Sequence, residues 1–120
     1  MKKPKIGVVG PCASGKSSLV SRLHAIGYNA RHIAQEHSYV PEMWKKITNP
    51  DVLIYLDVSY ENTRKRKELT WSFEEFELQL NRLVHARQHA NFIVHTDTLT
   101  LDDVLLSVID FLESTNSIHG

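Results

Sequence analysis

The chain has 120 residues, 42% of them hydrophobic, and its 14 basic and 14 acidic side chains give a formal net charge of zero at pH 7. This size and composition predict a single domain over residues 1–120, and the lack of a long apolar run argues against a membrane-spanning protein. The balanced charge predicts no broad basic surface, so nucleic acid is not an expected partner, and the short apolar run after the basic start is no signal peptide, which favours a cytoplasmic protein.

The first elements in chain order are a strand, a loop and a helix. Lys5–Val9 is an apolar run that predicts a buried strand, and Ser17–Ile26 has the pattern of a helix that ends before Gly27. Between them, residues 10–17 read Gly-Pro-Cys-Ala-Ser-Gly-Lys-Ser and fit the phosphate-binding pattern G-x-x-x-x-G-K-[ST]. Strand, loop and helix are the order that this motif requires.

The residue types of this loop suit the phosphates of a nucleotide. Gly10 and Gly15 allow backbone torsions that turn N–H groups inward, next to the positive end of the helix dipole. We expect Lys16 to reach the β- and γ-phosphates and the Ser17 hydroxyl to ligate Mg²⁺. Cys12 is the chain's one cysteine, which fits a reducing cytoplasm. The predicted nucleotide-binding residues of the loop are Gly10, Pro11, Cys12, Ala13, Ser14, Gly15, Lys16, Ser17 and Ser18.

The rest of the chain alternates strands and helices. Capping boxes at Ser72 with Glu75 and at Thr100 with Asp103 predict two helix starts. The further elements that we expect are an extended segment Asn29–Gln35, a short helix Glu42–Ile47, a strand Asp51–Val58, a helix Tyr60–Glu68, a helix from Ser72 to about Ala90, a strand Asn91–His95, a final helix after Thr100 and a frayed tail Ser114–Gly120.

This alternation predicts an α/β protein with the three-layer P-loop NTPase fold, in which a mostly parallel sheet has helices on both faces. Ligands of such sheets lie at the carboxyl ends of the strands. That rule selects the loop at residues 10–17, then residues 35–37, then Asp57 and then Thr96–Asp97.

Three segments resemble the nucleoside and nucleotide kinases of the P-loop superfamily. The first is the loop. Asn49–Glu61 is similar to the family's "PD-hydrophobic-YLDV-x-x-E" strand and turn, and Phe92–Thr100 is similar to its last strand and "TD-x-L" turn, which lies near the base. The resemblance implies ATP or another NTP with Mg²⁺, a small-molecule phosphoryl acceptor, and a lid arginine that contacts the nucleotide. Arg66 is the first candidate for that arginine and Arg64 the second.

The chain departs from the family in the acceptor region. Family members carry a helical insertion and an Asp-Arg strand before the YLD strand, whereas here Glu36–Asn49 occupies that interval. The acceptor is therefore expected to be small, or a partner chain completes the site, for example in a homodimer.

Two carboxylates are candidates for the acid that works with Mg²⁺ or with the acceptor hydroxyl. Asp57 ends the most hydrophobic strand and is the choice by pattern, as a catalytic residue and Mg²⁺ ligand. Glu36 could end the strand on the other side of the loop strand, where the resembled kinases place their working acid. Further candidates for substrate contacts are His37, Trp44, Trp71, Arg82 and Arg87. The i, i+4 pair His85 and His89 lacks an evident third metal ligand.

The function favoured by these residues is transfer of a phosphoryl group from ATP to a nucleoside, a nucleotide or a similar acceptor, with Lys16, Glu36, Asp57 and Arg66 as catalytic residues. The alternative is an NTP hydrolase or nucleotide-dependent switch that acts with a protein partner, which the short acceptor region favours. A kinase of polynucleotide ends is disfavoured by the neutral net charge.

Overall fold

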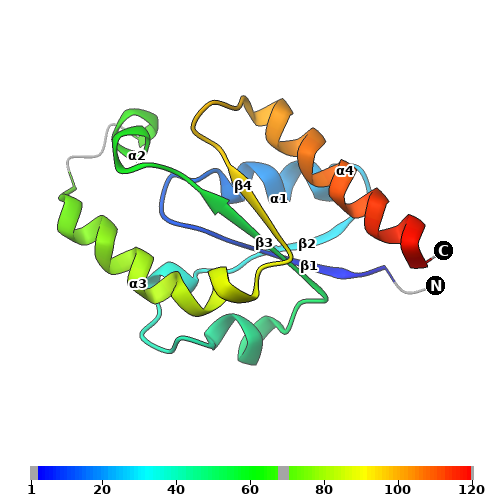
Figure 1. Ribbon diagram of the computed structural model, residues 1–120, viewed down its shortest axis with the longest axis horizontal. Helices are drawn as coiled ribbons and strands as arrows, with labels where there is room; N and C mark the ends of the chain where they lie inside the picture. Colours follow the sequence, from blue (N-terminus) through cyan, green and yellow to red (C-terminus); the bar gives the residue numbers. More distant parts are fainter. Residues whose placement is uncertain (1–2, 68–70, 120) are drawn as a thin grey trace.

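The computed structural model describes residues 3–67 and 71–119. Its four strands form one parallel sheet in the order β2-β1-β3-β4, and helices connect most of them (Figure 1). The strands are β1 Lys5–Val9, β2 Asn29–His32, β3 Val52–Asp57 and β4 Phe92–His95. The helices are α1 Lys16–Ala25, α2 Tyr60–Lys67, α3 Phe73–His89 and α4 Leu101–His119, with a 3₁₀ turn η1 Gln35–His37 and a π turn η2 Trp44–Thr48.

Alternating side chains of the central strands build a core on each face of the sheet, as the pleat requires. Ile54 and Leu56 of β3 belong to the core on the side of α1 and α4, whereas Leu53 and Tyr55 belong to the core on the side of α3. Figure 1 shows α1 and α4 on one side of the sheet and α3 on the other. The predicted α/β class, with a parallel sheet between two helical layers, is therefore confirmed.

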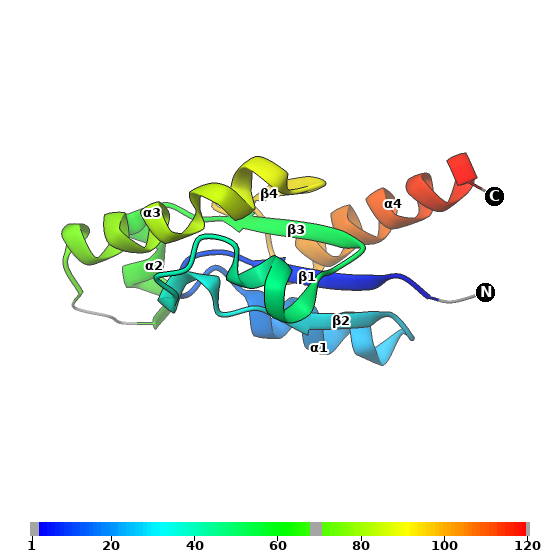
Figure 2. The ribbon, with the colours of Figure 1, turned by 90° about the horizontal axis from the view of Figure 1, so that it is seen from below.

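The four strands run in the same direction, so their carboxyl ends meet at one edge of the sheet. Backbone partners in the register are Val8 with His32, Val9 with Tyr55 and Asp57 with His95. Figure 2 shows β3, β1 and β2 lying next to one another in that order. The loop after β1 therefore lies between the segment that follows β2 and the segment that follows β3.

Three predicted elements differ clearly from the structure, whereas the other bounds agree within one residue, except that Glu68, the predicted end of the helix from Tyr60, lies outside the described residues. The second strand ends at His32 rather than Gln35, because the buried Gln35 side chain leaves the sheet and bonds the Trp44 amide and two carbonyls. The predicted helix Glu42–Ile47 is instead a π turn, closed by the hydrogen bond from the Asn49 amide to the Trp44 carbonyl.

The final helix continues to His119, through most of the segment for which we predicted a frayed tail. Residues 114–119 contain no glycine or proline, so nothing in their sequence stops the helix. The apolar face of the preceding turns already holds the helix against the core. Both capping boxes are present, at Ser72 with Glu75 and at Thr100 with Asp103. Within residues 3–67 and 71–119, no helix combines the length and the hydrophobicity needed to cross a membrane.

Candidate functional site

The loop between β1 and α1 needs its glycines for two different reasons. A Cβ atom on Gly10 would lie 2.5 Å from the Leu56 carbonyl oxygen and 2.7 Å from Ser14 Oγ, so no other residue fits there. Gly15 has φ 99°, in the left-handed region, and comes directly before α1. Ala13 also has a positive φ of 64°. These torsions fold the loop over the amino-terminal end of α1, whose first N–H groups have no partners within the helix.

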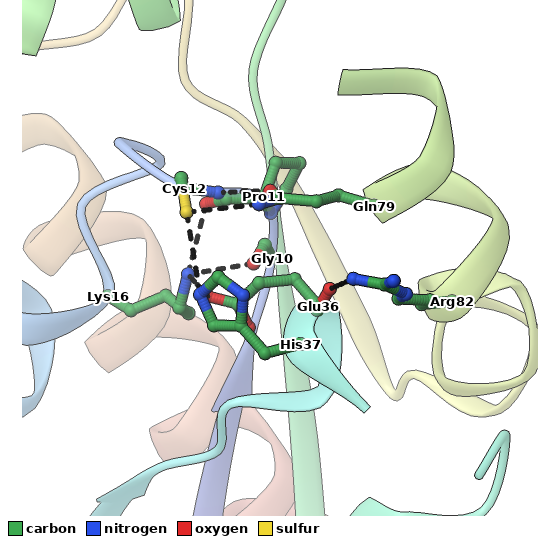
Figure 3. Close-up of polar contacts among 8 residues, drawn as sticks. All are labelled: Gly10, Pro11, Cys12, Lys16, Glu36, His37, Gln79 and Arg82. Atoms are coloured by element: carbon green, nitrogen blue, oxygen red, sulfur yellow. Dashed lines mark hydrogen bonds and ion pairs between the residues drawn. The ribbon is translucent and has the colours of Figure 1, made fainter. Parts of the chain in front are cut away.

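Lys16 is buried and directs its ammonium group back toward the loop (Figure 3). Its Nζ donates to the carbonyl oxygens of Gly10 at 2.7 Å and Pro11 at 3.0 Å, and lies 2.8 Å from Oε2 of Glu36. An ammonium group has three N–H donors, so these three oxygens satisfy it. A phosphate at the loop would have to replace at least one of them.

Glu36 lies beside Lys16 because η1 turns the chain under the loop. Its side chain is 4% exposed, and Oε2 takes the ion pair with Lys16. The other oxygen, Oε1, is buried and has no hydrogen-bond partner among the described residues. Burying a carboxylate with one unpaired oxygen is costly, so this atom is a candidate for contact with a ligand.

Cys12 and His37 complete the group around Lys16. The Cys12 sulfur lies 3.7 Å from Nε2 of His37, which is 3.9 Å from Oε2 of Glu36. Gln79 of α3 bonds Cys12 twice: its Oε1 accepts from the Cys12 amide at 3.0 Å, and its Nε2 donates to the sulfur at 3.2 Å. Figure 3 shows these side chains converging on one point from the loop, η1 and α3.

Arg66 reaches the loop from α2, the helix that follows β3. Its Nη1 bonds the carbonyl oxygen of Ala13 at 3.2 Å and Oγ1 of Thr96 at 3.2 Å, and its Nη2 bonds the carbonyl oxygen of Thr96 at 2.9 Å. The guanidinium group therefore connects the loop to the end of β4. It also brings a positive charge to the cavity wall.

A cavity of about 690 Å³ opens over the loop and the start of α1. Its lining includes the charged Lys16 and Glu36 and, from the turn after β4 and from α4, the apolar Leu99, Leu101 and Val104. The predicted site residues that line it are Cys12, Ala13, Ser14, Gly15, Lys16, Ser17, Ser18, Glu36 and Arg66. A volume of this size accommodates a molecule as large as a nucleotide.

The structure does not bring Asp57 or Arg64 to this cavity. Asp57 Oδ2 lies 2.9 Å from Nδ1 of His95, the residue beside it in β4, and the side chain is 35% exposed. Arg64 lies over the ring of Tyr60, 5.8 Å from its centroid. Gly10 and Pro11 do not line the cavity either, but their carbonyl oxygens hold Lys16.

The remaining candidates for substrate contacts lie away from the cavity, except His37. Trp44 is buried in the core and donates to Nδ1 of His85, whose ring stacks on His89. Trp71 donates from its indole nitrogen to Thr63 of α2. The two arginines differ: Arg82 bonds the carbonyl oxygen of Glu36 at 3.3 Å, whereas Arg87 lies over the Tyr55 ring.

Two groups on the β3 side have shifted pKa values. Burial raises the pKa of Tyr55 to about 12, and the nearby negative charge of Asp57 adds to the shift. Partial burial alone would raise the pKa of Asp97, but hydrogen bonds from Ser59 and Asn62, with the charge of Arg66, lower it below its ordinary value. Both groups therefore keep one charge state around neutral pH.

Sequence reasoning missed Gln79, whose signal was weak but present. It is a polar residue next to Leu80 and three positions after Phe76, on the buried side of an amphipathic helix. A buried amide needs partners, and here the partner is Cys12.

No protein-family model matches the chain, and no curated protein matches it significantly. Function must therefore be inferred from the chemistry of the site.

Proposed function

We propose that this protein is a P-loop phosphotransferase, similar to nucleoside and nucleotide kinases, that moves the γ-phosphoryl group of ATP or another NTP to a small acceptor. The observation that carries the proposal is the buried Lys16–Glu36 ion pair in a cavity whose wall is a glycine-containing loop that opens a helix. Such a loop binds phosphates through its N–H groups and the helix dipole. The ion pair adds a cation and a carboxylate side by side.

Lys16 is the residue that would change partners when a nucleotide binds. Two of its three acceptors are neutral carbonyl oxygens of its own loop. A phosphate oxygen carries negative charge and forms a stronger, charge-assisted hydrogen bond, so it would displace a carbonyl. Arg66 adds a second positive charge at the cavity wall. Together they would stabilise the charge that spreads over the transferred phosphoryl group.

Glu36 is the better-placed carboxylate for the acceptor. Its unpaired Oε1 is available to accept the proton of the acceptor's hydroxyl group while the oxygen of that hydroxyl group forms a bond to the γ-phosphorus. The bond from the γ-phosphorus to the bridging oxygen breaks, and the diphosphate product leaves with its electron pair. Asp57 would not take part, because it lies against His95 outside the cavity.

The residues around the loop suit Mg²⁺, which prefers oxygen ligands. The hydroxyl of Ser17, at an exposed position in the first turn of α1, would hold the ion, and Glu36 is the one carboxylate among the described residues that line the cavity. Mg²⁺ there would neutralise charge on the β- and γ-phosphates. The observation that supports this fit is that Ser17 and Glu36 line the same cavity, and Oε1 of Glu36 remains for the acceptor.

A second function, an NTP hydrolase or switch that acts with a protein partner, is favoured by one observation. Between η1 and β3 the chain has only the η2 turn and irregular segments, and Tyr39, Val40 and Ile47 of that region are exposed. This region offers little to enclose an acceptor. A small acceptor, a second copy of the chain or a partner protein would have to complete the site.

The proposal is tested by incubating the purified protein with γ-labelled ATP, Mg²⁺ and a panel of nucleosides, nucleoside monophosphates and short oligonucleotides. We expect label on a nucleoside or nucleotide and none with Lys16→Ala. Label released only as inorganic phosphate would favour the hydrolase, and label on oligonucleotides would favour a polynucleotide kinase. No transfer and no hydrolysis would contradict both enzymatic proposals.

A further inference from the structure

Three side chains with metal-binding atoms meet at the mouth of the loop: Cys12, Glu36 and His37. One ligand atom from each lies within 4.8 Å of the other two, and Figure 3 shows the Cys12 sulfur directed toward the His37 ring. The phosphate-binding motif does not need a cysteine at position 12 or a histidine at position 37, because only Gly10, Gly15, Lys16 and Ser17 are defined by it. Cys12 and His37 therefore have no role in the proposed phosphoryl transfer, although Glu36 does.

The spacing of the cluster suits Zn²⁺. Tetrahedral Zn²⁺ with sulfur, nitrogen and oxygen ligands holds neighbouring ligand atoms roughly 3.3–3.6 Å apart, given its bond lengths. The two separations that involve His37, 3.7 Å to the Cys12 sulfur and 3.9 Å to Glu36, exceed this only slightly, and the third, from Cys12 to Glu36, is within 4.8 Å. Small movements of His37, whose side chain is 59% exposed, would close the first two, and a shift of the Cys12 or Glu36 side chain would close the third.

Two further observations point to a ligand at this place. Glu36 Oε2, the oxygen 3.9 Å from His37, also pairs with Lys16, whereas Oε1 of the same side chain is buried and has no hydrogen-bond partner among the described residues, so the carboxylate has an oxygen left for a ligand. Gln79 donates a hydrogen bond to the Cys12 sulfur at 3.2 Å, which orients the sulfur. Outer hydrogen bonds of this kind orient metal ligands and contribute to affinity.

We propose that Cys12, Glu36 and His37 bind Zn²⁺ at the mouth of the phosphate-binding loop, with a water molecule or a phosphate oxygen as the fourth ligand. Binding releases the thiol proton to solvent. The consequence for activity rests on the proposed function: Zn²⁺ on Glu36 occupies the carboxylate that would accept the acceptor's proton, so Zn²⁺ inhibits phosphoryl transfer. The metal site itself does not depend on that function.

The test is a titration of untagged protein with Zn²⁺ in competition with a chromogenic chelator, repeated with Co²⁺ to record the thiolate-to-metal absorption band. We expect one Zn²⁺ per chain and a charge-transfer band with Co²⁺. Cys12→Ser should abolish the band, and Cys12→Ser and His37→Gln should each weaken Zn²⁺ binding by at least about tenfold. His37 is largely exposed, so His37→Gln keeps the test valid if Cys12→Ser fails to fold.

His89→Gln is the matched control, because His89 stacks on His85 at a second place where two imidazoles are close. It should leave Zn²⁺ binding unchanged. Wild-type affinity in both Cys12→Ser and His37→Gln, or loss of binding in His89→Gln, would overturn the proposal. A protein that binds Zn²⁺ through Cys12 but never turns over a nucleotide would retain the metal site and refute the proposed function alone.

Discussion

The two sides of the loop between β1 and α1 present their carboxylates very differently. On the β2 side, Glu36 is buried, pairs with Lys16 and lines the cavity. On the β3 side, Asp57 is partly exposed, pairs with His95 and lies outside the cavity. Asp57 ends β3 and Glu36 comes shortly after β2, at the same edge of the sheet, so a place at the end of a strand is not enough to define a catalytic acid. Burial and the identity of the partner separate the two.

Lys16→Ala is expected to have the largest effect, because it removes the cation from the side of the loop that we regard as active. Phosphoryl transfer should fall by about 10³-fold, as expected for loss of a charged donor to the transferred group. The measurement is steady-state turnover, with circular dichroism to confirm folding, since the change leaves Glu36 buried without its cation. Turnover close to that of the wild type would remove the loop from the mechanism.

Glu36→Gln and Asp57→Asn compare the two sides directly. Glu36→Gln should lower kcat by about 10²-fold or more, because an amide cannot accept the acceptor's proton. Asp57→Asn should change kcat by less than about threefold, since the group lies outside the cavity and makes an exposed pair. The opposite ranking would move the catalytic acid to the β3 side.

Arg66→Met and Arg64→Met compare, within one helix, the two arginines that the sequence suggested for a lid. Arg66 lines the cavity and bonds the loop, so its loss should lower kcat/KM for ATP by about tenfold to a hundredfold. Arg64 contacts Tyr60, and its loss should have little effect on kinetics. Equal losses in the two variants would argue that only the charge of α2 matters.

Tyr55 gives the smallest effect, on stability rather than activity. Because its pKa is raised to about 12 in the folded protein, the folded state favours the neutral phenol. That stabilisation is complete below about pH 10, the ordinary tyrosine pKa, and is lost as the pH rises toward 12. A shift of this size corresponds to about 2–3 kcal/mol.

Denaturant unfolding between pH 9 and pH 12 checks this prediction. The wild type should lose stability over roughly pH 10–12, and Tyr55→Phe should lose markedly less. Tyr39→Phe is the control, because Tyr39 is exposed. A wild-type stability that does not change with pH over this range would contradict the account of Tyr55.

Much of the fold follows from local patterns in the sequence. The apolar runs of β1 and β3 and the capping boxes of α3 and α4 are short-range signals, and the structure contains all four elements. The break after His32 depends on Gln35, whose partners are Val40, Trp44 and, from 47 positions away in the chain, Arg82. No local pattern encodes the contact with Arg82.

The candidate site, like the fold, could be predicted in part from local sequence patterns and in part only from the structure. The loop motif identified Lys16 and its neighbours, but the sequence left Glu36 and Asp57 as alternatives. Choosing between them required the turn of η1, which buries Glu36 beneath the loop, and the β4 register, which places His95 beside Asp57. The role of Gln79 in holding Cys12 likewise joins residues 67 positions apart.

The central claim is that the loop with Lys16 binds the phosphates of a nucleotide. It is tested most directly by calorimetric titration of the protein with ATP, ADP, AMP and adenosine in the presence of Mg²⁺, in parallel with Lys16→Ala. The account predicts that affinity increases with the number of phosphates and that this dependence disappears in Lys16→Ala. Equal affinity for ATP and adenosine, or binding that Lys16→Ala does not change, would contradict it.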